Sequence, residues 1–346
     1  MIRQLLNTLF VQTPHAYVRL EGDTLRVEVE KECRLQVPIQ HLGAVVLFGD
    51  AMMSPGAMGR CAADGREVTF LDFSGRFRCR VAGPTRGNVL LRAAQYEAAR
   101  TPAKALEIAR RMVGAKIRNS RITLLRGVRD ATTEEPRRAL AEAAAGLATS
   151  LAASRTAPTL DDLRGVEGES AARYFAAFGQ LLTVETSAFA FTLRTRRPPR
   201  DRVNALLSFL YAVLANDCAA AAEGVGLDPQ IGFLHALRSG RPALALDLME
   251  EFRSGLADRL TVTLINRRQL RPEHFDVREE AGGSVLLNEE GRKAVITAYQ
   301  GRKEEETRHR LLKGETPLGL APHLQARLLA RHLRGEVEQY QPFLFR

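Results

Sequence analysis

The pattern of apolar residues in this chain changes its period near residue 85. Before that point, apolar and polar residues alternate in short runs, which is typical of strands with one buried face. Two such runs over 16–30 predict a hairpin, and a second hairpin is predicted over 67–81. A fully apolar run at 44–49 predicts a further strand. We therefore expect the N-terminal segment to be β-rich and to form two packed sheets.

Helical periodicity begins after a segment at 82–88 that is rich in Gly and Pro and predicts a linker. The run 203–222 is apolar on nearly every side, as expected for the central helix of a bundle. Further helices are predicted at 90–125 (with a break near Pro102), 134–154, 168–182, 244–266 and 289–338 (with a break near Thr316-Pro317), and a short hairpin within 275–287. The expected fold class is α+β multidomain, with a β-sandwich-like N-terminal domain at 1–85 and a mainly α-helical domain at 86–346.

The sequence argues against several classes of protein. No apolar run reaches the length of about 18 residues that a membrane-spanning helix needs. The first residues lack the long apolar core and cleavage site of a signal peptide. The four cysteines, Cys33, Cys61, Cys79 and Cys218, form no CxxC pair, which argues against a zinc knuckle or a disulfide framework. We expect buried free thiols in a cytoplasmic protein without a membrane partner.

The basic residues are clustered and outnumber the acids, with 50 Lys and Arg against 40 Asp and Glu. Segment 76–92 contains no acid, 100–129 contains nine basic residues and one acid, and 194–202 contains five Arg and one Asp. Such clustering favours a polyanionic partner, because the planar guanidinium of Arg pairs bidentately with phosphate. The candidate DNA contacts are Arg76, Arg78, Arg86, Arg111, Arg118, Arg196 and Arg197. The alternative is that these clusters only form solvated faces.

Acidic residues and one histidine stand in otherwise apolar segments. Glu167 lies at the expected start of a helix, His235 ends an apolar turn, and Asp247 and Glu250 share one helix face at i and i+3. Glu251 lies about 100° further round and is expected to be exposed. Carboxylates beside apolar residues are costly unless they are solvated, paired or bound to a cation. Carboxylates with one imidazole would suit Mg²⁺ or Mn²⁺ better than zinc; helix caps and a core histidine remain the alternative.

Four sequence blocks together resemble the signature of one protein family. They are GVEGESAARYF (165–175), RTRRPPRDRVNALLSFLYAVL (194–214), GFLHALRSGRPALALDLMEEFR (232–253) and INRRQL (265–270). In this order they are similar to the CRISPR-associated endonuclease/integrase of the spacer-adaptation module, and they resemble most the variant from class I systems with a compact Cascade. The resemblance implies metal-dependent cleavage and transfer of DNA strands, which inserts spacers into the repeat array.

The resemblance also assigns roles to residues. It implies that Glu167, His235 and Glu250 are the ligands of Mg²⁺ or Mn²⁺, and that Asp247 is a supporting acid or accessory ligand of the same catalytic set. The family often has Asp at the position of Glu250. Arg253 matches a basic family position and is a further candidate phosphate contact. Asn204 and Ser208 are expected either to brace the site or to be packing polars of a helix.

The resemblance further implies partners. These are double-stranded DNA (the prespacer and the CRISPR repeat with its leader), a second copy of the chain in a homodimer, and the small second Cas adaptation protein. The β-rich domain, with edge strands to protect, is the candidate dimerisation surface. The competing hypotheses are a non-catalytic DNA-binding scaffold and a branched-DNA repair nuclease. A protein of anionic membranes is disfavoured, because the basic clusters lack a paired apolar face.

Overall fold

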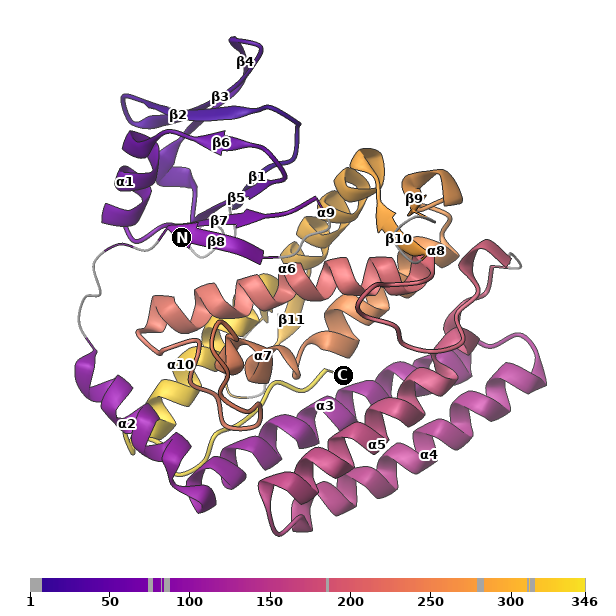
Figure 1. The fold of residues 1–346 in the computed structure, drawn as a ribbon. Helices are drawn as coiled ribbons and strands as arrows, with labels where there is room; N and C mark the ends of the chain where they lie inside the picture. The colour runs from indigo at the N-terminus through magenta and orange to yellow at the C-terminus, as the bar shows by residue number, and fades with distance from the viewer. Residues whose placement is uncertain are drawn as a thin grey trace.

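A β-rich N-terminal part stands on a larger helical part in the computed structural model of the protein (Figure 1). The structure describes residues 8–73, 77–81, 83, 88–184, 187–278, 283–309, 311 and 315–345. Arg76, Arg86 and most of the expected linker at 82–88 lie outside the described residues. The predicted change from strands to helices is confirmed on either side of this segment.

The N-terminal part contains two four-stranded sheets, as the alternating sequence predicts. One has the order β4-β3-β2-β6 and the other the order β1-β5-β7-β8. The strands are β1 (Thr8–Val11), β2 (Tyr17–Glu21), β3 (Thr24–Val29), β4 (Glu32–Pro38), β5 (Ala44–Phe48), β6 (Met52–Met53), β7 (Glu67–Leu71) and β8 (Phe77–Val81), with helix α1 (Pro55–Ala63) before β7. Both predicted hairpins, β2–β3 and β7–β8, are antiparallel pairs.

Strand β5 is apolar throughout because both of its faces are buried. Val45 and Leu47 face the core between the two sheets. Val46 and Phe48 point the other way, into the core of the helical part, where the ring of Phe48 stacks on Phe209 at 6.0 Å between centroids. Successive strand side chains alternate between faces, so one short strand contributes to both cores.

Two cysteines depart from the expectation that all four thiols are buried. Cys61 and Cys218 are buried, but Cys33 and Cys79 are exposed. Cys33 lies on β4, which is exposed along almost its whole length and reaches the core between the two sheets through Val37.

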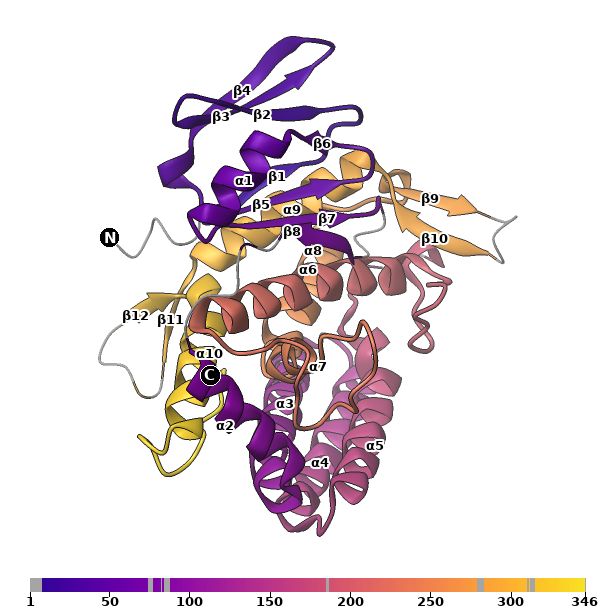
Figure 2. The ribbon, with the colours of Figure 1, turned by 60° about the vertical axis from the view of Figure 1, so that its left-hand side comes forward.

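Helix α6 (Arg202–Val225) lies between the β-rich part and the helices below it, as Figures 1 and 2 both show. It is long and apolar enough to cross a membrane by length and composition, but 61% of its most apolar window is buried inside the protein. The helix packs against α7 and α10, among other elements. Its composition is therefore explained by its place at the centre of the core, as the sequence predicted.

Around α6 stand the remaining helices and two small hairpins. They are α2 (Val89–Arg100), α3 (Pro102–Asp130), α4 (Glu134–Thr156), α5 (Leu160–Phe178), α7 (Ala243–Met249), α8 (Arg259–Asn266), α9 (Glu289–Glu304) and α10 (Ala321–Leu333), with the hairpins β9 (Phe275–Arg278)–β10 (Ser284–Leu287) and β11 (Glu306–Arg308)–β12 (Glu315–Pro317). Helices α3, α4 and α5 form a bundle on one side of α6 (Figure 1). The hairpin β11–β12 lies between α9 and α10, and β12 falls at the break predicted near Thr316-Pro317.

Two element boundaries differ from the prediction, and both affect the site. Helix α5 begins at Leu160, where the side chain of Thr159 accepts a hydrogen bond from the backbone N–H of Asp162. Glu167 therefore lies in the middle of this helix and not at its start. The helix predicted over 244–266 is broken by a turn after α7 and by the π-helical segment Arg253–Asp258.

Candidate active site

Asp247 is the buried centre of a small hydrogen-bonded loop. Its Oδ2 accepts hydrogen bonds from the backbone N–H groups of Phe233 (2.6 Å) and Leu234 (3.0 Å). Its Oδ1 accepts from the backbone N–H of His235 (3.1 Å) and lies 2.6 Å from Nδ1 of the same residue. A carboxylate oxygen accepts hydrogen bonds, so Nδ1 is the donor of this contact and Nε2 is the ring nitrogen that remains available to other partners. The carboxylate thus fixes the orientation of the imidazole.

The other ring nitrogen of His235, Nε2, faces Glu250. His235 Nε2 lies 3.9 Å from Glu250 Oε1, which also pairs with Arg253 Nη2 at 3.0 Å. The other oxygen, Oε2, lies 2.8 Å from the ammonium of Lys116. Burial alone would raise the pKa of Glu250, but the charges of Arg253, Lys116 and His235 outweigh it and lower the pKa to about 2. Glu250 is therefore an ionised carboxylate inside the protein.

Glu167 approaches the same point from α5. It forms an ion pair with Lys116 of α3, so that one ammonium lies between the carboxylates of Glu167 and Glu250. The fold thus brings together three residues that are far apart in the sequence, Glu167, His235 and Glu250. Among the described residues, no three His, Cys, Asp or Glu side chains already form a compact metal cage. Lys116 stands between the two carboxylates that would have to approach each other.

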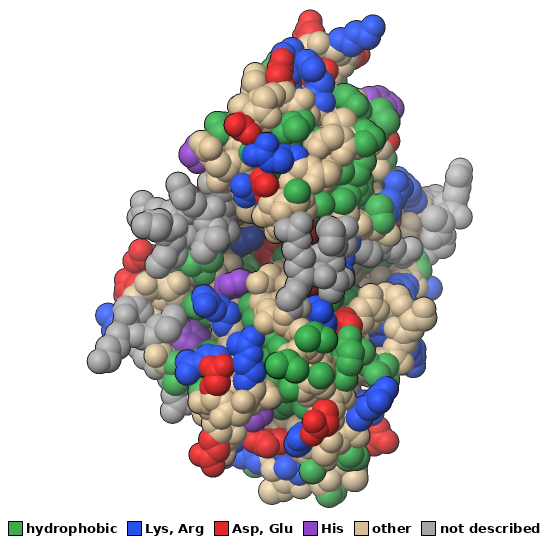
Figure 3. Space-filling view, turned by 90° about the vertical axis from the view of Figure 1, so that its left-hand side faces the viewer, with side chains coloured by type: hydrophobic (Ala, Val, Ile, Leu, Met, Phe, Trp, Pro, Cys, Tyr) green, Lys and Arg blue, Asp and Glu red, His purple; other side chains and the backbone are tan. Residues whose placement is uncertain are grey.

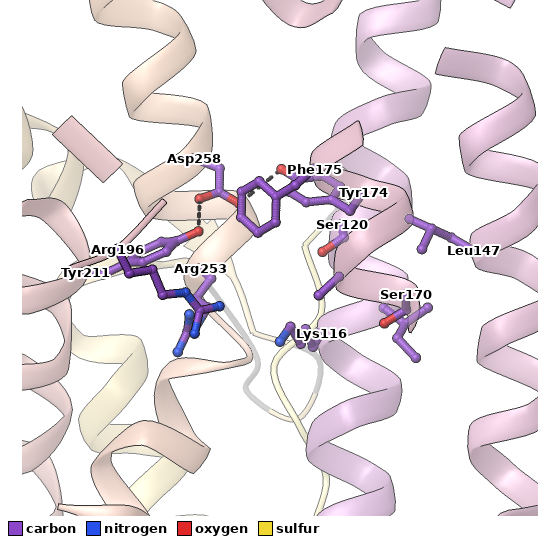
Figure 4. A pocket seen from close by; sticks show the side chains of 12 residues that line it. Lys116, Ser120, Leu147, Ser170, Tyr174, Phe175, Arg196, Tyr211, Arg253 and Asp258 are labelled. Carbon is purple, nitrogen blue, oxygen red and sulfur yellow. Dashed lines mark hydrogen bonds between the residues drawn. The ribbon is translucent and has the colours of Figure 1, made fainter. Parts of the chain in front are cut away.

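A basic pocket adjoins this cluster. Its cationic lining comes from Lys116, Arg196 and Arg253. In Figure 4 the nitrogen-bearing ends of Arg196 and Arg253 lie across the pocket from Lys116. The rest of the lining is apolar, serine and aromatic side chains with one acid, namely Ile117, Ser120, Leu147, Ser170, Ala171, Tyr174, Phe175, Tyr211 and Asp258. Three cations around one hollow favour an anion such as a phosphodiester.

Among the residues that line the pocket, Asp258 is a buried acid that is hydrogen-bonded to two tyrosines. Asp258 accepts hydrogen bonds from the hydroxyl groups of Tyr211 (2.6 Å) and Tyr174 (3.0 Å), which are drawn in Figure 4. Burial raises the pKa of Asp258 to about 6, although both hydrogen bonds lower it. The guanidinium of Arg253 lies over the ring of Tyr211 at 4.7 Å. Arg253 is therefore held both by the ring of Tyr211 and by its ion pair with Glu250.

Asn204 and Ser208 hold the arginine-rich loop against α6. Arg194 donates hydrogen bonds to Asn204 Oδ1 (2.7 Å) and Ser208 Oγ (3.0 Å). The amide of Asn204 also donates to the backbone carbonyl of Leu193 (2.8 Å). These contacts favour the bracing role over simple packing, because they fix the loop that carries Arg196.

The other candidate DNA contacts are spread over the surface. Arg118 and Arg197 are exposed, while the half-buried Arg111 is hydrogen-bonded to Gln339. Arg78 is exposed and donates to the backbone carbonyl of Gly49 at 3.0 Å. On the face drawn in Figure 3, basic and acidic side chains are interspersed. Of the predicted arginines that the structure describes, Arg196 and Arg253 are the two that line the pocket.

The expectation that Glu251 is exposed is wrong. Its side chain is fully buried and accepts hydrogen bonds from Tyr340, from Gln325 (2.9 Å) and from the backbone N–H of Phe343 (2.6 Å). The physical reason is the turn after α7, because residues 250 and 251 no longer follow a regular helix and both point inward.

Sequence patterns also missed parts of the site. Lys116 was one member of a basic cluster, and nothing in its spacing marks it as the partner of two carboxylates. Tyr211 and Asp258 looked like ordinary residues of helices. The one available signal was their polarity within apolar runs.

Gly232 allows the backbone to pass close to Asp247, so a larger residue at this position should destabilise the fold. A Cβ at this position would lie 2.6 Å from Asp247 Oδ2 and 2.7 Å from the carbonyl carbon of Ala243. We expect Gly232→Ala to lower the free energy of unfolding by about 1–3 kcal/mol, since neither neighbour can move freely. Urea denaturation measures this change. The control is Gly165→Ala in α5, where a Cβ meets nothing within 4 Å; an equal loss in both variants would contradict the prediction.

The sequence of this chain matches one protein family over most of its length. The family model "CRISPR associated protein Cas1" matches residues 9–301 of the chain. The chain is 54% identical over 342 residues to a protein of Moorella thermoacetica named CRISPR-associated endonuclease Cas1 1, and the match covers 99% of each chain.

Two solved structures share the fold. One is a casposase bound to its integration product, with a TM-score of 0.84 at 20% identity, covering 98% of this chain and 94% of that one. The other is a Cas6-RT-Cas1–Cas2 complex, with a TM-score of 0.82 at 24% identity, covering 98% of this chain. This chain spans 36% of the length of that longer chain.

Proposed function

This chain belongs to the Cas1 family of CRISPR-associated proteins, and from that premise we propose that it is the endonuclease and integrase of spacer acquisition. It cleaves DNA strands and transfers them, inserting foreign DNA into the CRISPR array. The observation that carries this function is the meeting of Glu167, His235 and Glu250 at the edge of a pocket with cationic walls. A scaffold that only bound DNA would have no use for buried acids in a surface meant for phosphates.

The donor set fits a hard divalent cation. Glu250 Oε2 is buried and accepts no well-aligned hydrogen bond from the described residues, having only the ion pair with Lys116. The position of the Lys116 ammonium between two carboxylates supports a preference for positive charge at this point. We propose that Glu167, His235 Nε2 and Glu250 hold Mg²⁺ or Mn²⁺. When bound, the ion would polarise the scissile phosphate and neutralise charge developing on its oxygens.

The protein's own residues orient the reaction. Asp247 is saturated by four donors, so we propose that it positions His235 rather than binding the ion. Arg196, Arg253 and Lys116 would bind the DNA backbone in the pocket beside the carboxylates. Either a 3′-hydroxyl or water could then attack in line at phosphorus, so that one site serves joining and cleavage.

The partners follow from the same function. We propose that the DNA substrates are the prespacer and the CRISPR repeat with its leader. We also propose that the chain acts in the cytoplasm as a homodimer, assembled through the N-terminal domain at 1–85, together with the small second adaptation protein. The catalytic domain would comprise 86–346. One structure of similar fold is a Cas6-RT-Cas1–Cas2 complex, which supports the partnership with the second adaptation protein.

Removal of divalent metal provides the test. With Mg²⁺ or Mn²⁺, we expect the protein to cut branched DNA and to join a strand with a free 3′-hydroxyl to a supercoiled plasmid carrying a repeat. With a chelator, both reactions should fall to the background level while DNA binding persists, because the arginines need no metal. Gel assays of the two products and a binding titration measure this. Binding without strand breakage in any metal would identify a scaffold, and cutting of branched DNA without joining would identify a repair nuclease.

A further inference from the structure

The turn that carries Glu250 lacks the support of a regular helix. Helix α7 ends at Met249, and the π-helical segment starts at Arg253. Between them, the backbone N–H groups of residues 250–252 bond to carbonyls three residues earlier, at 3.2, 3.3 and 3.0 Å. Such short-range bonds define a tight turn, but they do not extend a helical ladder through it. The direction of Glu250 and Arg253 therefore depends on contacts from elsewhere in the chain.

Those contacts come from segment 340–345, about 90 residues further along the chain. Tyr340 donates its hydroxyl hydrogen to Glu251 Oε1, and the backbone N–H of Phe343 donates to Glu251 Oε2 at 2.6 Å. Gln325 donates to Glu251 Oε2 at 2.9 Å and to the hydroxyl oxygen of Tyr340 at 2.9 Å. Both oxygens of Glu251 thus accept from groups outside the turn, and two of the three donors, Tyr340 and Phe343, belong to segment 340–345.

Asn119 fastens the same segment to α3. Its amide nitrogen donates to the carbonyls of Glu251 (2.8 Å) and Phe343 (3.0 Å), and its amide oxygen accepts from the N–H of Phe345 (3.0 Å). Asn119 lies one helical turn after Lys116, the residue that pairs with Glu167 and Glu250. One buried side chain therefore joins α3, the turn and segment 340–345.

Aromatic packing adds to these hydrogen bonds. The ring of Phe343 lies 5.3 Å from that of Phe252 and 4.9 Å from that of Phe345. Phe345 in turn covers Gly255 so closely that a Cβ there would lie 2.2 Å from the ring. Segment 340–345 therefore contacts the turn at Glu251 and Phe252 and the π-helical segment at Gly255.

We infer that segment 340–345 positions the turn of Glu250 and Arg253, with Tyr340 acting through Glu251 as a positioning residue. The inference rests on the proposed function for its catalytic consequence, but the positioning itself is a property of the fold. Loss of the Tyr340 hydroxyl leaves one buried carboxylate oxygen without its donor, so Glu251 turns toward other donors and takes its neighbour Glu250 with it. A shift of about 1 Å at a catalytic group can cost about 10²-fold in rate.

A pair of tyrosine variants tests this. Tyr340→Phe removes the hydroxyl beside Glu251 and keeps the ring. Tyr299→Phe is the matched control, because Tyr299 on α9 is equally buried and donates to Asp217 at 2.8 Å, outside the site. We expect Tyr340→Phe to speed amide exchange at residues 248–256, to weaken Mn²⁺ binding measured by electron paramagnetic resonance about tenfold, and to slow strand cleavage by about 10–100-fold, partly rescued by excess Mn²⁺. Tyr299→Phe should leave all three unchanged.

A second variant keeps the inference testable if Tyr340→Phe fails to fold. Phe343→Leu trims the ring that packs on Phe252 but keeps the N–H that binds Glu251, so a smaller change in the same direction is expected. Equal amide exchange at 248–256 in Tyr340→Phe and Tyr299→Phe would overturn the inference. If the unmodified protein neither binds Mn²⁺ nor cuts DNA, the proposed function fails. Amide exchange would still decide whether segment 340–345 positions the turn.

Discussion

Glu167→Gln is expected to reduce metal-dependent cleavage and joining of DNA by about 10³-fold or more, while the affinity for DNA falls little. Glutamine keeps the size of the side chain but removes one of the two negative charges that meet at Lys116. A carboxylate that binds a divalent ion cannot be replaced by a neutral amide without losing much of the ion's affinity. The affinity for DNA is set by the arginines, whose charges do not change.

Glu169→Gln is the matched control for this variant. Glu169 lies on the same helix two residues later, is exposed and pairs with Arg173 at 2.9 Å. Initial rates of strand cleavage at saturating Mn²⁺, together with filter-binding titrations, compare the two variants with the unmodified protein. Full activity of Glu167→Gln, or an equal loss in both variants, would remove Glu167 from the site.

Asp247→Ala should destabilise the fold and abolish activity together. It leaves the buried backbone N–H groups of Phe233, Leu234 and His235 without an acceptor and frees the imidazole to rotate. An unsatisfied buried donor costs about 1–3 kcal/mol, so a total loss of about 3–5 kcal/mol in the free energy of unfolding is expected. Urea denaturation followed by circular dichroism measures this loss.

The control for Asp247→Ala is Asp161→Ala. Asp161 is exposed in the first turn of α5 and pairs with Arg164 at 2.6 Å, which is a surface contact worth about 0.2–1 kcal/mol. If Asp247→Ala unfolds at the same urea concentration as Asp161→Ala, the buried loop at 233–235 does not depend on this carboxylate.

The periodicity of apolar residues was sufficient to predict the elements that are buried on nearly all of their faces. The run at 44–49 is a strand with two buried faces, and 203–222 is a helix surrounded by protein. The start of α5 was missed because Gly165 and Gly168 weaken the helical pattern, although both lie where a Cβ has open space. The π-helical segment was missed because it is stabilised by partners far along the chain, which no local pattern contains.

Some residues of the candidate site could be predicted from the sequence and others could not. The family blocks identified Glu167, His235 and Glu250, which the fold brings to one place, but spacing along the chain could not show that Lys116 lies between the two carboxylates. Glu251 was predicted to be exposed because its neighbours suggest a regular helix. Its burial depends on Tyr340 and Phe343, which act across about 90 residues of sequence.

The strand β5 limits how this protein can be recombined with its relatives. Its alternate side chains belong to two cores, and Phe48 fits against Phe209 in the middle of α6. A chimera spliced near residue 85 would join the β-rich part of one parent to a helical part that evolved against a different strand. Compatible crossovers must therefore exchange β5 and α6 as a unit, even though more than 150 positions separate them in the gene.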